Sequence, residues 1–242
     1  MKIILSPSKT QDFGQHHDAP MTLPIYEAQS IQLNNSLKRL SKANLSKLMK
    51  INGQLLDETY DNIRHFKTAA PNHALATYTG LVYKNFDMDA YKQEEFDYLN
   101  THLNLLSAHY GILRPYDGIR PYRLDMKMKP NNKDLYKFWA KTMNDYFKDE
   151  ALIIDLASNE FSKLVKANKV TVGFRDLQDG TYKNLATYAK MARGKLLHQM
   201  VLNKTTTLDG LKSIIFDGYS YNPSISKENL ILFTRNVQEK CL

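Results

Sequence analysis

The apolar run ALIIDLAS at residues 151–158 limits the folds open to this chain more than any other feature of the sequence. It has the length of a strand, and only Asp155 interrupts its small and hydrophobic side chains. A continuous run of this kind is typical of a strand that is covered on both faces of its sheet. The sequence therefore predicts a central sheet that lies between layers of other elements.

Further strands are predicted near both ends of the chain, with helices between them. KIILS at 2–6 and NLILFTR at 229–235 are short strands, and KVTVGFRDLQDGTYKNL at 169–185 is a hairpin that turns at Asp179-Gly180. Apolar residues at helical spacing predict helices over about 25–40, 41–51, 54–66, 90–109, 135–147, 185–202 and 207–216. No repeat or linker interrupts them. We expect a single domain over 1–242 of the α+β class, with mixed α/β character.

The composition points away from membranes and oxidising compartments. The only cysteine is Cys241, so the chain forms no disulfide of its own. The segment MKIILSPSKT has only Ile-Ile-Leu before Pro7, whereas the apolar part of a signal peptide needs roughly 7–15 residues. No stretch approaches the ~20 apolar residues of a membrane helix. We expect a soluble, cytoplasmic protein without a membrane partner.

The positive charge of the chain is concentrated in two segments. The net charge is +8, from 33 Lys and Arg against 25 Asp and Glu. Residues 107–141 carry eight basic and three acidic side chains, and residues 183–204 carry five basic and no acidic ones. This concentration is expected of a surface that meets a polyanion. A solvated basic face is the alternative that charge alone leaves open.

Three arginines stand in a segment that cannot continue as a helix. In LSAHYGILRPYDGIRPYRLDMKMK at 106–129, prolines and glycines separate Arg114, Arg120 and Arg123. A stiff loop of this kind presents planar cations to phosphate, and Tyr122 adds a ring for stacking. Ion pairing of the arginines with Asp117 or Asp125 is the alternative. The start of the segment also resembles a helix-hairpin-helix, although Leu113 replaces its usual second glycine.

A second basic group, YAKMARG at 188–194, is predicted to lie on a helix. Lys190 and Gly194 are four residues apart, and Arg193 neighbours Lys190 at the i+3 position. A glycine inside a helix costs ~1 kcal/mol relative to alanine, so its presence requires a reason. Either it leaves room for a ligand beside the cations, or it is a packing glycine beside solvated cations.

Two loops that follow predicted strands add polar groups. SPSKT at 6–10 offers Lys9 and hydroxyls to a phosphate, but it lacks the glycines of a P-loop. SNE at 158–160 supplies either binding groups or the cap of the next helix. The histidines and the single cysteine have no metal-ligand spacing, so we predict no metal and no cofactor.

Five segments together resemble the YaaA peroxide-stress family. They are IILSPSKT, LSAHYGILRPYDGIRPYRLDM, DLYKFWAK, IIDLASNEF and YAKMARGKL, in the family's order over most of the chain. The resemblance implies a mixed α/β domain of unusual topology with a basic cleft and a helix-hairpin-helix-like element. It implies binding of duplex or distorted DNA, without strong sequence preference, in the response to hydrogen peroxide. It also implies that the protein limits oxidative damage and available iron.

The leading hypothesis is a DNA-binding stress protein without an established catalytic activity. The DNA-binding residues carried over from matching motifs are Lys9, Arg114, Arg120, Tyr122, Arg123, Lys190 and Arg193. The alternative is an enzyme that acts on a nucleotide, a nucleobase or damaged DNA in the basic cleft. Direct iron chelation is disfavoured because no Asp, Glu and His cluster has suitable spacing.

Overall fold

A mixed sheet forms the centre of the protein in the computed structural model, which describes residues 1–14 and 19–236. Its strand order is β4-β3-β1-β6-β7-β10-β9, with β8 beside β7. Neighbours among β3, β1, β6, β7 and β10 run parallel, and β4, β8 and β9 are antiparallel additions. The strands are β1 (Lys2–Leu5), β3 (Leu103–Ser107), β4 (Gly111–Leu113), β6 (Ile153–Asp155), β7 (Val170–Gln178), β8 (Thr181–Lys183), β9 (Ser220–Tyr221) and β10 (Leu230–Asn236). A separate two-stranded sheet pairs β2 (Asn72–His73) with β5 (Gly118–Ile119).

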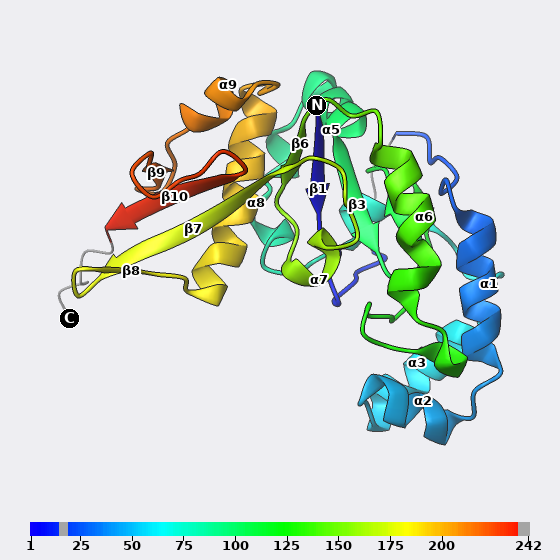
Figure 1. Cartoon of the computed structure of the whole chain (residues 1–242). Helices are drawn as coiled ribbons and strands as arrows, with labels where there is room; N and C mark the ends of the chain where they lie inside the picture. The colour runs from blue at the N-terminus through cyan, green and yellow to red at the C-terminus, as the bar shows by residue number, and fades with distance from the viewer. Residues whose placement is uncertain (15–18, 237–242) are drawn as a thin grey trace.

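Helices cover both faces of the central sheet (Figure 1). The α-helices are α1 (Glu27–Lys38), α2 (Lys42–Met49), α3 (Gly53–His65), α4 (Ala74–Thr77), α5 (Gln93–His102), α6 (Leu135–Phe147), α7 (Asn159–Ser162), α8 (Ala186–Leu202) and α9 (Leu208–Lys212). Three short 3-10 turns are η1 (Tyr83–Asn85), η2 (Met88–Ala90) and η3 (Pro130–Asn132). The architecture is therefore α/β, as the sequence predicted. None of the helices in the described ranges is long and apolar enough to cross a membrane.

Alternation along the central strands explains why both faces are covered. Successive side chains of a strand point to opposite faces. Ile3 and Ile154 accordingly belong to a first core that includes α5, α8 and α9. Ile4 and Ile153 belong to a second core that includes α1, α2, α3, α6 and α7. The strand predicted from the apolar run at 151–158 is confirmed, because β6 is fully buried between β1 and β7.

Several elements were predicted correctly from local signals. The helix at 135–147 has the predicted bounds, and Asp134 caps it by accepting a hydrogen bond from the Lys137 amide. The hairpin of β7 and β8 turns at Asp179-Gly180. Thr207 caps α9, although that helix ends at Lys212. Cys241, by contrast, lies outside the described residues.

The predicted helix over 90–109 is wrong at both ends. It begins at Gln93 after Lys92, and residues 103–107 form β3 instead of its last turns. The leucines of this segment fit the spacing of a helix and also the alternation of a strand. In the structure Leu103 and Leu105 face the first core, and Leu106 faces the second. Pairing with β1 decides in favour of a strand. Such tertiary pairing overrides local helix propensity.

The expected helix-hairpin-helix-like element is also wrong at Tyr110–Leu113. This stretch forms the turn and second strand of the β3–β4 hairpin. Gly111 has a φ of +76°, and a Cβ there would lie 2.6 Å from the ring of Trp139. The glycine therefore serves a tight turn under α6 and offers no amides to a ligand from between two helices.

Candidate functional site

A cavity of about 440 Å³ lies where β1 and β6 end at their carboxyl sides. The sheet has the order β3-β1-β6-β7, so the chain continues from β1 to β3 on one side and from β6 to β7 on the other. Neighbouring parallel strands whose connections lead in opposite directions along the sheet form a topological switch point, where open α/β sheets bind ligands. The cavity occupies this position.

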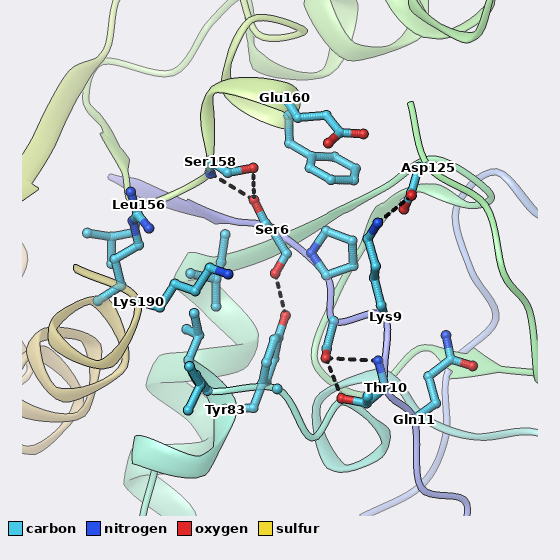
Figure 2. A pocket seen from close by; sticks show the side chains of 18 of the residues that line it. Ser6, Lys9, Thr10, Gln11, Tyr83, Asp125, Leu156, Ser158, Glu160 and Lys190 are labelled. Carbon is cyan, nitrogen blue, oxygen red and sulfur yellow. Dashed lines mark hydrogen bonds and ion pairs between the residues drawn. The ribbon is translucent and has the colours of Figure 1, made fainter. Parts of the chain in front are cut away.

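Hydrogen bonds fix the loops that form the floor of the cavity (Figure 2). The Ser158 amide donates to Ser6 Oγ over 2.8 Å, and the Ser6 hydroxyl donates to Ser158 Oγ over 3.1 Å. The Tyr83 hydroxyl donates to the Ser6 carbonyl over 2.7 Å. The loops after β1 and β6 and the turn η1 are thereby tied together. Ser158 thus cross-links two strand ends, and its side chain makes no capping hydrogen bond to α7.

Lys9 and Asp125 form an ion pair on one side of the cavity. Lys9 Nζ lies 2.5 Å from Asp125 Oδ2, and both residues line the cavity. Because of this pair, the charge of Lys9 is largely balanced before any ligand binds. Within the same SPSKT loop, the Thr10 amide donates to Ser8 Oγ. Figure 2 shows the pair of Lys9 and Asp125 across the cavity from Lys190.

Helix α8 supplies two cations on the opposite wall. Lys190 and Arg193 both line the cavity, as their predicted helical spacing allows. Gly194 on the same helix packs against η1, because a Cβ there would lie 2.1 Å from the Val82 carbonyl oxygen. The packing explanation is thus the correct one for the glycine. The close approach also brings Val82 and Tyr83 to the cavity wall.

Both arginines that line the cavity, Arg123 and Arg193, keep an unsatisfied polar atom. The Nε atoms of Arg123 and Arg193 are buried, and neither has a hydrogen-bond partner in the described part of the chain. Burial lowers the pKa of the Arg193 guanidinium, and the nearby charge of Asp155 opposes this shift in part. A buried donor without a partner is costly, and a buried cation more so. An anion in the cavity would offset the cost of the buried charge.

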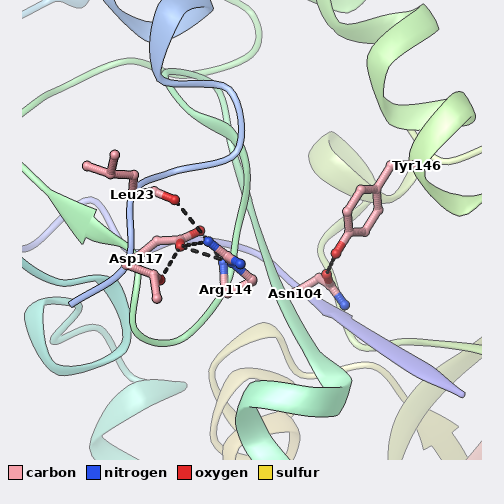
Figure 3. Close-up of polar contacts among 6 residues, drawn as sticks. Leu23, Asn104, Arg114, Asp117 and Tyr146 are labelled. Atoms are coloured by element: carbon pink, nitrogen blue, oxygen red, sulfur yellow. Dashed lines mark hydrogen bonds and ion pairs between the residues drawn. The ribbon is translucent and has the colours of Figure 1, made fainter. Parts of the chain in front are cut away.

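Arg114 lies outside the cavity and is bound to a carboxylate (Figure 3). Its Nε and Nη2 donate to Asp117 Oδ1 over 3.0 and 2.8 Å, and Nη2 also donates to the Leu23 carbonyl. Asp117 is fully buried and accepts further bonds from the Thr22 hydroxyl and the Arg114 amide. This is the ion-pair alternative raised from the sequence.

Arg120 also lies away from the cavity. Its Nε donates to the Ala69 carbonyl over 3.1 Å, and its Nη1 lies 3.3 Å from a carboxylate oxygen of Glu27. The guanidinium is placed 5.9 Å from the centre of the Phe66 ring. Arg120 thus fastens the loop that follows β5 to α1 and to the segment after α3. The structure brings neither Arg114 nor Arg120 to the other predicted cations.

Tyr122 reaches the cavity with its ring and not with a free hydroxyl. The hydroxyl is engaged with the Tyr78 hydroxyl at 2.7 Å and with Ser107 Oγ at 2.9 Å. Burial raises the pKa of Tyr122 to about 12, so the group stays protonated at neutral pH. Only the ring face remains available for contact with a ligand.

The sequence missed several cavity residues because no local pattern marks them. Leu81, Val82 and Tyr83 lie in a segment of ambiguous pattern and reach the site through the packing of η1 on α8. Phe161, on α7, also lines the cavity, and no pattern in the sequence assigns it to a site. Glu160, raised as a possible binding group, lines the cavity while one of its oxygens accepts from the Met126 amide. Within residues 1–14 and 19–236, no group of three or more His, Cys, Asp or Glu could hold a metal ion.

Comparison with known proteins supports one family along nearly the whole chain. Residues 1–225 match the family described as Peroxide stress protein YaaA. A UPF0246 protein of Fusobacterium nucleatum is 35% identical over 246 residues, which cover 97% of this chain and 99% of that protein. A UPF0246 protein of Acaryochloris marina is 33% identical over 252 residues, which cover 98% of this chain and 100% of that protein. The resemblance seen in the sequence motifs is confirmed, and the chain belongs to the YaaA peroxide stress protein family.

Proposed function

We propose that the protein binds DNA through the cations around the switch-point cavity, as its part in the response to hydrogen peroxide. Arg123, Lys190 and Arg193 would contact the phosphates. The observation that carries the proposal is the convergence of these three cations without a carboxylate bonded to any of them in the described residues. Cations left unpaired by the fold are available to a polyanion.

Lys9 and Tyr122 have secondary places in this proposal. Lys9 is already paired with Asp125, so it would exchange one partner for another and add little net attraction. Tyr122 would contribute the face of its ring. Arg114 and Arg120 are left out of the DNA contact because the fold uses both guanidinium groups.

DNA binding connects the family's stress role to a physical effect. A bound protein shields the phosphates and sugars that it covers from oxidants formed near the DNA. The proposed limitation of oxidative damage follows from this coverage. Lower available iron, which the family resemblance implies, is proposed as a separate effect and is measured separately in cells. The family assignment does not favour the alternative of an enzyme that acts on a nucleotide, a nucleobase or damaged DNA.

A salt titration of binding to a short duplex tests the proposal. Three neutralised phosphates correspond to a slope of log K against log salt of about −2.7, at about −0.9 for each phosphate. Replacement of both Arg123 and Lys190 by alanine should bring the slope to about −0.9 and weaken binding to every sequence. Lys195→Ala is the matched control, because it removes a cation of α8 that is paired with Asp217. Equal slopes for the wild-type and the folded double variant would remove these residues from the interface.

A further inference from the structure

We infer that the cavity admits one nucleotide turned out of the DNA stack, with its base inside and its phosphate at the mouth. This inference rests on the proposed function and names the part of the DNA that enters the site. It begins with the size of the site. A cavity of about 440 Å³ holds a small molecule, and a duplex cannot enter it. A paired duplex can therefore touch only the rim.

The residues that line the cavity are partly charged at its mouth and largely apolar inside. Lys9, Leu81 and Lys190 are exposed lining residues, so the mouth carries two of the cations. The inner walls are largely apolar and are formed by buried side chains of Leu5, Tyr83, Leu124, Leu156 and Phe161. A phosphate forms no favourable contacts with apolar walls, whereas a nucleobase is stabilised by packing against them. The two chemistries together match a nucleotide unit.

The position of the two arginines of the cavity agrees with this orientation. The Nε atoms of Arg123 and Arg193 lack hydrogen-bond partners in the described part of the chain, and both residues line the cavity. A phosphate that follows an extruded base into the mouth lies near both positive charges and is attracted by them. Ser158 and Glu160, at the floor and side of the cavity, add polar groups for the edge of a base. Extrusion is least costly for a nucleotide that has no pairing partner.

Binding to a duplex with one unpaired nucleotide tests this inference. Two duplexes of the same length are compared, one fully paired and one with a single bulged 2-aminopurine, for affinity and for 2-aminopurine emission. We expect the bulged duplex to bind about 10-fold more tightly, because its extruded base contacts the apolar walls of the cavity. We also expect its emission to change when the protein binds.

Leu81→Trp is the variant that blocks the site, and Leu55→Trp is its control. Leu81 is 42% exposed and lines the cavity, so a larger side chain there narrows the mouth without removing a charge. Leu55 is 44% exposed on α3 and does not line the cavity. Leu81→Trp should abolish the preference and the emission change and keep the affinity for the paired duplex. Leu55→Trp should keep the preference for the bulged duplex and the change in 2-aminopurine emission.

The outcomes separate this inference from the proposed function. Equal affinity for both duplexes, with normal salt dependence and unchanged emission, overturns the inference and leaves DNA binding in place. A preference that Leu55→Trp also abolishes overturns it as well, because the cavity is then not its cause. Failure to bind either duplex removes both proposals. If free dAMP binds in a manner sensitive to Leu81→Trp but no bulge preference exists, the cavity takes a free nucleotide, and the inference that it admits a nucleotide of DNA is overturned.

Discussion

Removal of the Arg114 side chain should destabilise the fold and leave DNA binding intact. The change Arg114→Ala leaves Asp117 fully buried without its guanidinium partner, and within residues 1–14 and 19–236 only the Thr22 hydroxyl and the backbone amide of residue 114 then donate to it. Breaking a buried ion pair from one side costs ~3–5 kcal/mol. The Arg114 side chain is 36% exposed, so water reaches the gap and a smaller loss than this range, about 2–3 kcal/mol, is expected.

Urea unfolding and thermal unfolding, both followed by circular dichroism, measure this loss of stability. For a chain of 242 residues, about 2–3 kcal/mol corresponds to a decrease of about 5–10 °C in Tm. Lys141→Ala is the matched control, because it breaks an ion pair with Asp145 on the exposed face of α6 and should leave Tm unchanged. A double-mutant cycle with Asp117→Ala should give a large coupling energy.

The opposite result would refute the reasoning. If Arg114→Ala unfolds like the wild type and the folded variant loses affinity for duplex DNA, the arginine acts on a ligand and the ion pair is incidental. If the cycle gives no coupling, Asp117 is not the partner that the geometry indicates. In the first case Arg114 would return to the set of DNA-binding residues.

Three further predictions concern the packing, pH dependence and capping of the fold. Gly194→Ala should lower the free energy of unfolding despite better helix propensity, because its Cβ would lie 2.1 Å from the Val82 carbonyl oxygen; a gain of ~1 kcal/mol in urea unfolding would contradict this. Burial lowers the pKa of His109 to about 3, so below pH 6.5 only the unfolded state takes up its proton. Stability should then fall by about 1.4 kcal/mol per pH unit as the pH falls from 6.5 towards 3, and His109→Gln should flatten the measured slope. Thr207→Ala should cost about 1 kcal/mol in the same unfolding assay, since its hydroxyl oxygen accepts the Gly210 amide.

Elements with a self-contained signal could be predicted from the sequence, and elements decided by a distant partner could not. The helix at 135–147 carries its own cap and apolar stripe, and the β7–β8 hairpin carries its own turn. The strand at 103–107 becomes a strand only because β1, about a hundred residues earlier, lies beside it. Its leucines are compatible with either period, so the sequence pattern alone favoured the wrong element.

The same distinction applies to the candidate site. Lys190 and Arg193 were found because their spacing on one helix places them together, and the structure keeps them at the cavity. Val82 was missed because its position depends on a glycine more than a hundred residues later in the chain. No spacing rule links the two segments.

The arginines of the 106–129 segment show why charge alone does not locate an interface. A guanidinium that is bonded to a buried carboxylate cannot move towards a phosphate, and the carboxylate neutralises most of the positive potential that would attract one. Arg114 is held in this way by Asp117, and Arg120 is held by Glu27 and a backbone carbonyl. Arg123, from the same loop, faces the cavity with its buried Nε unsatisfied among the described residues. Arg114 and Arg120 therefore stabilise the fold, whereas Arg123 lines the cavity. The difference depends on whether a carboxylate lies within reach of each guanidinium.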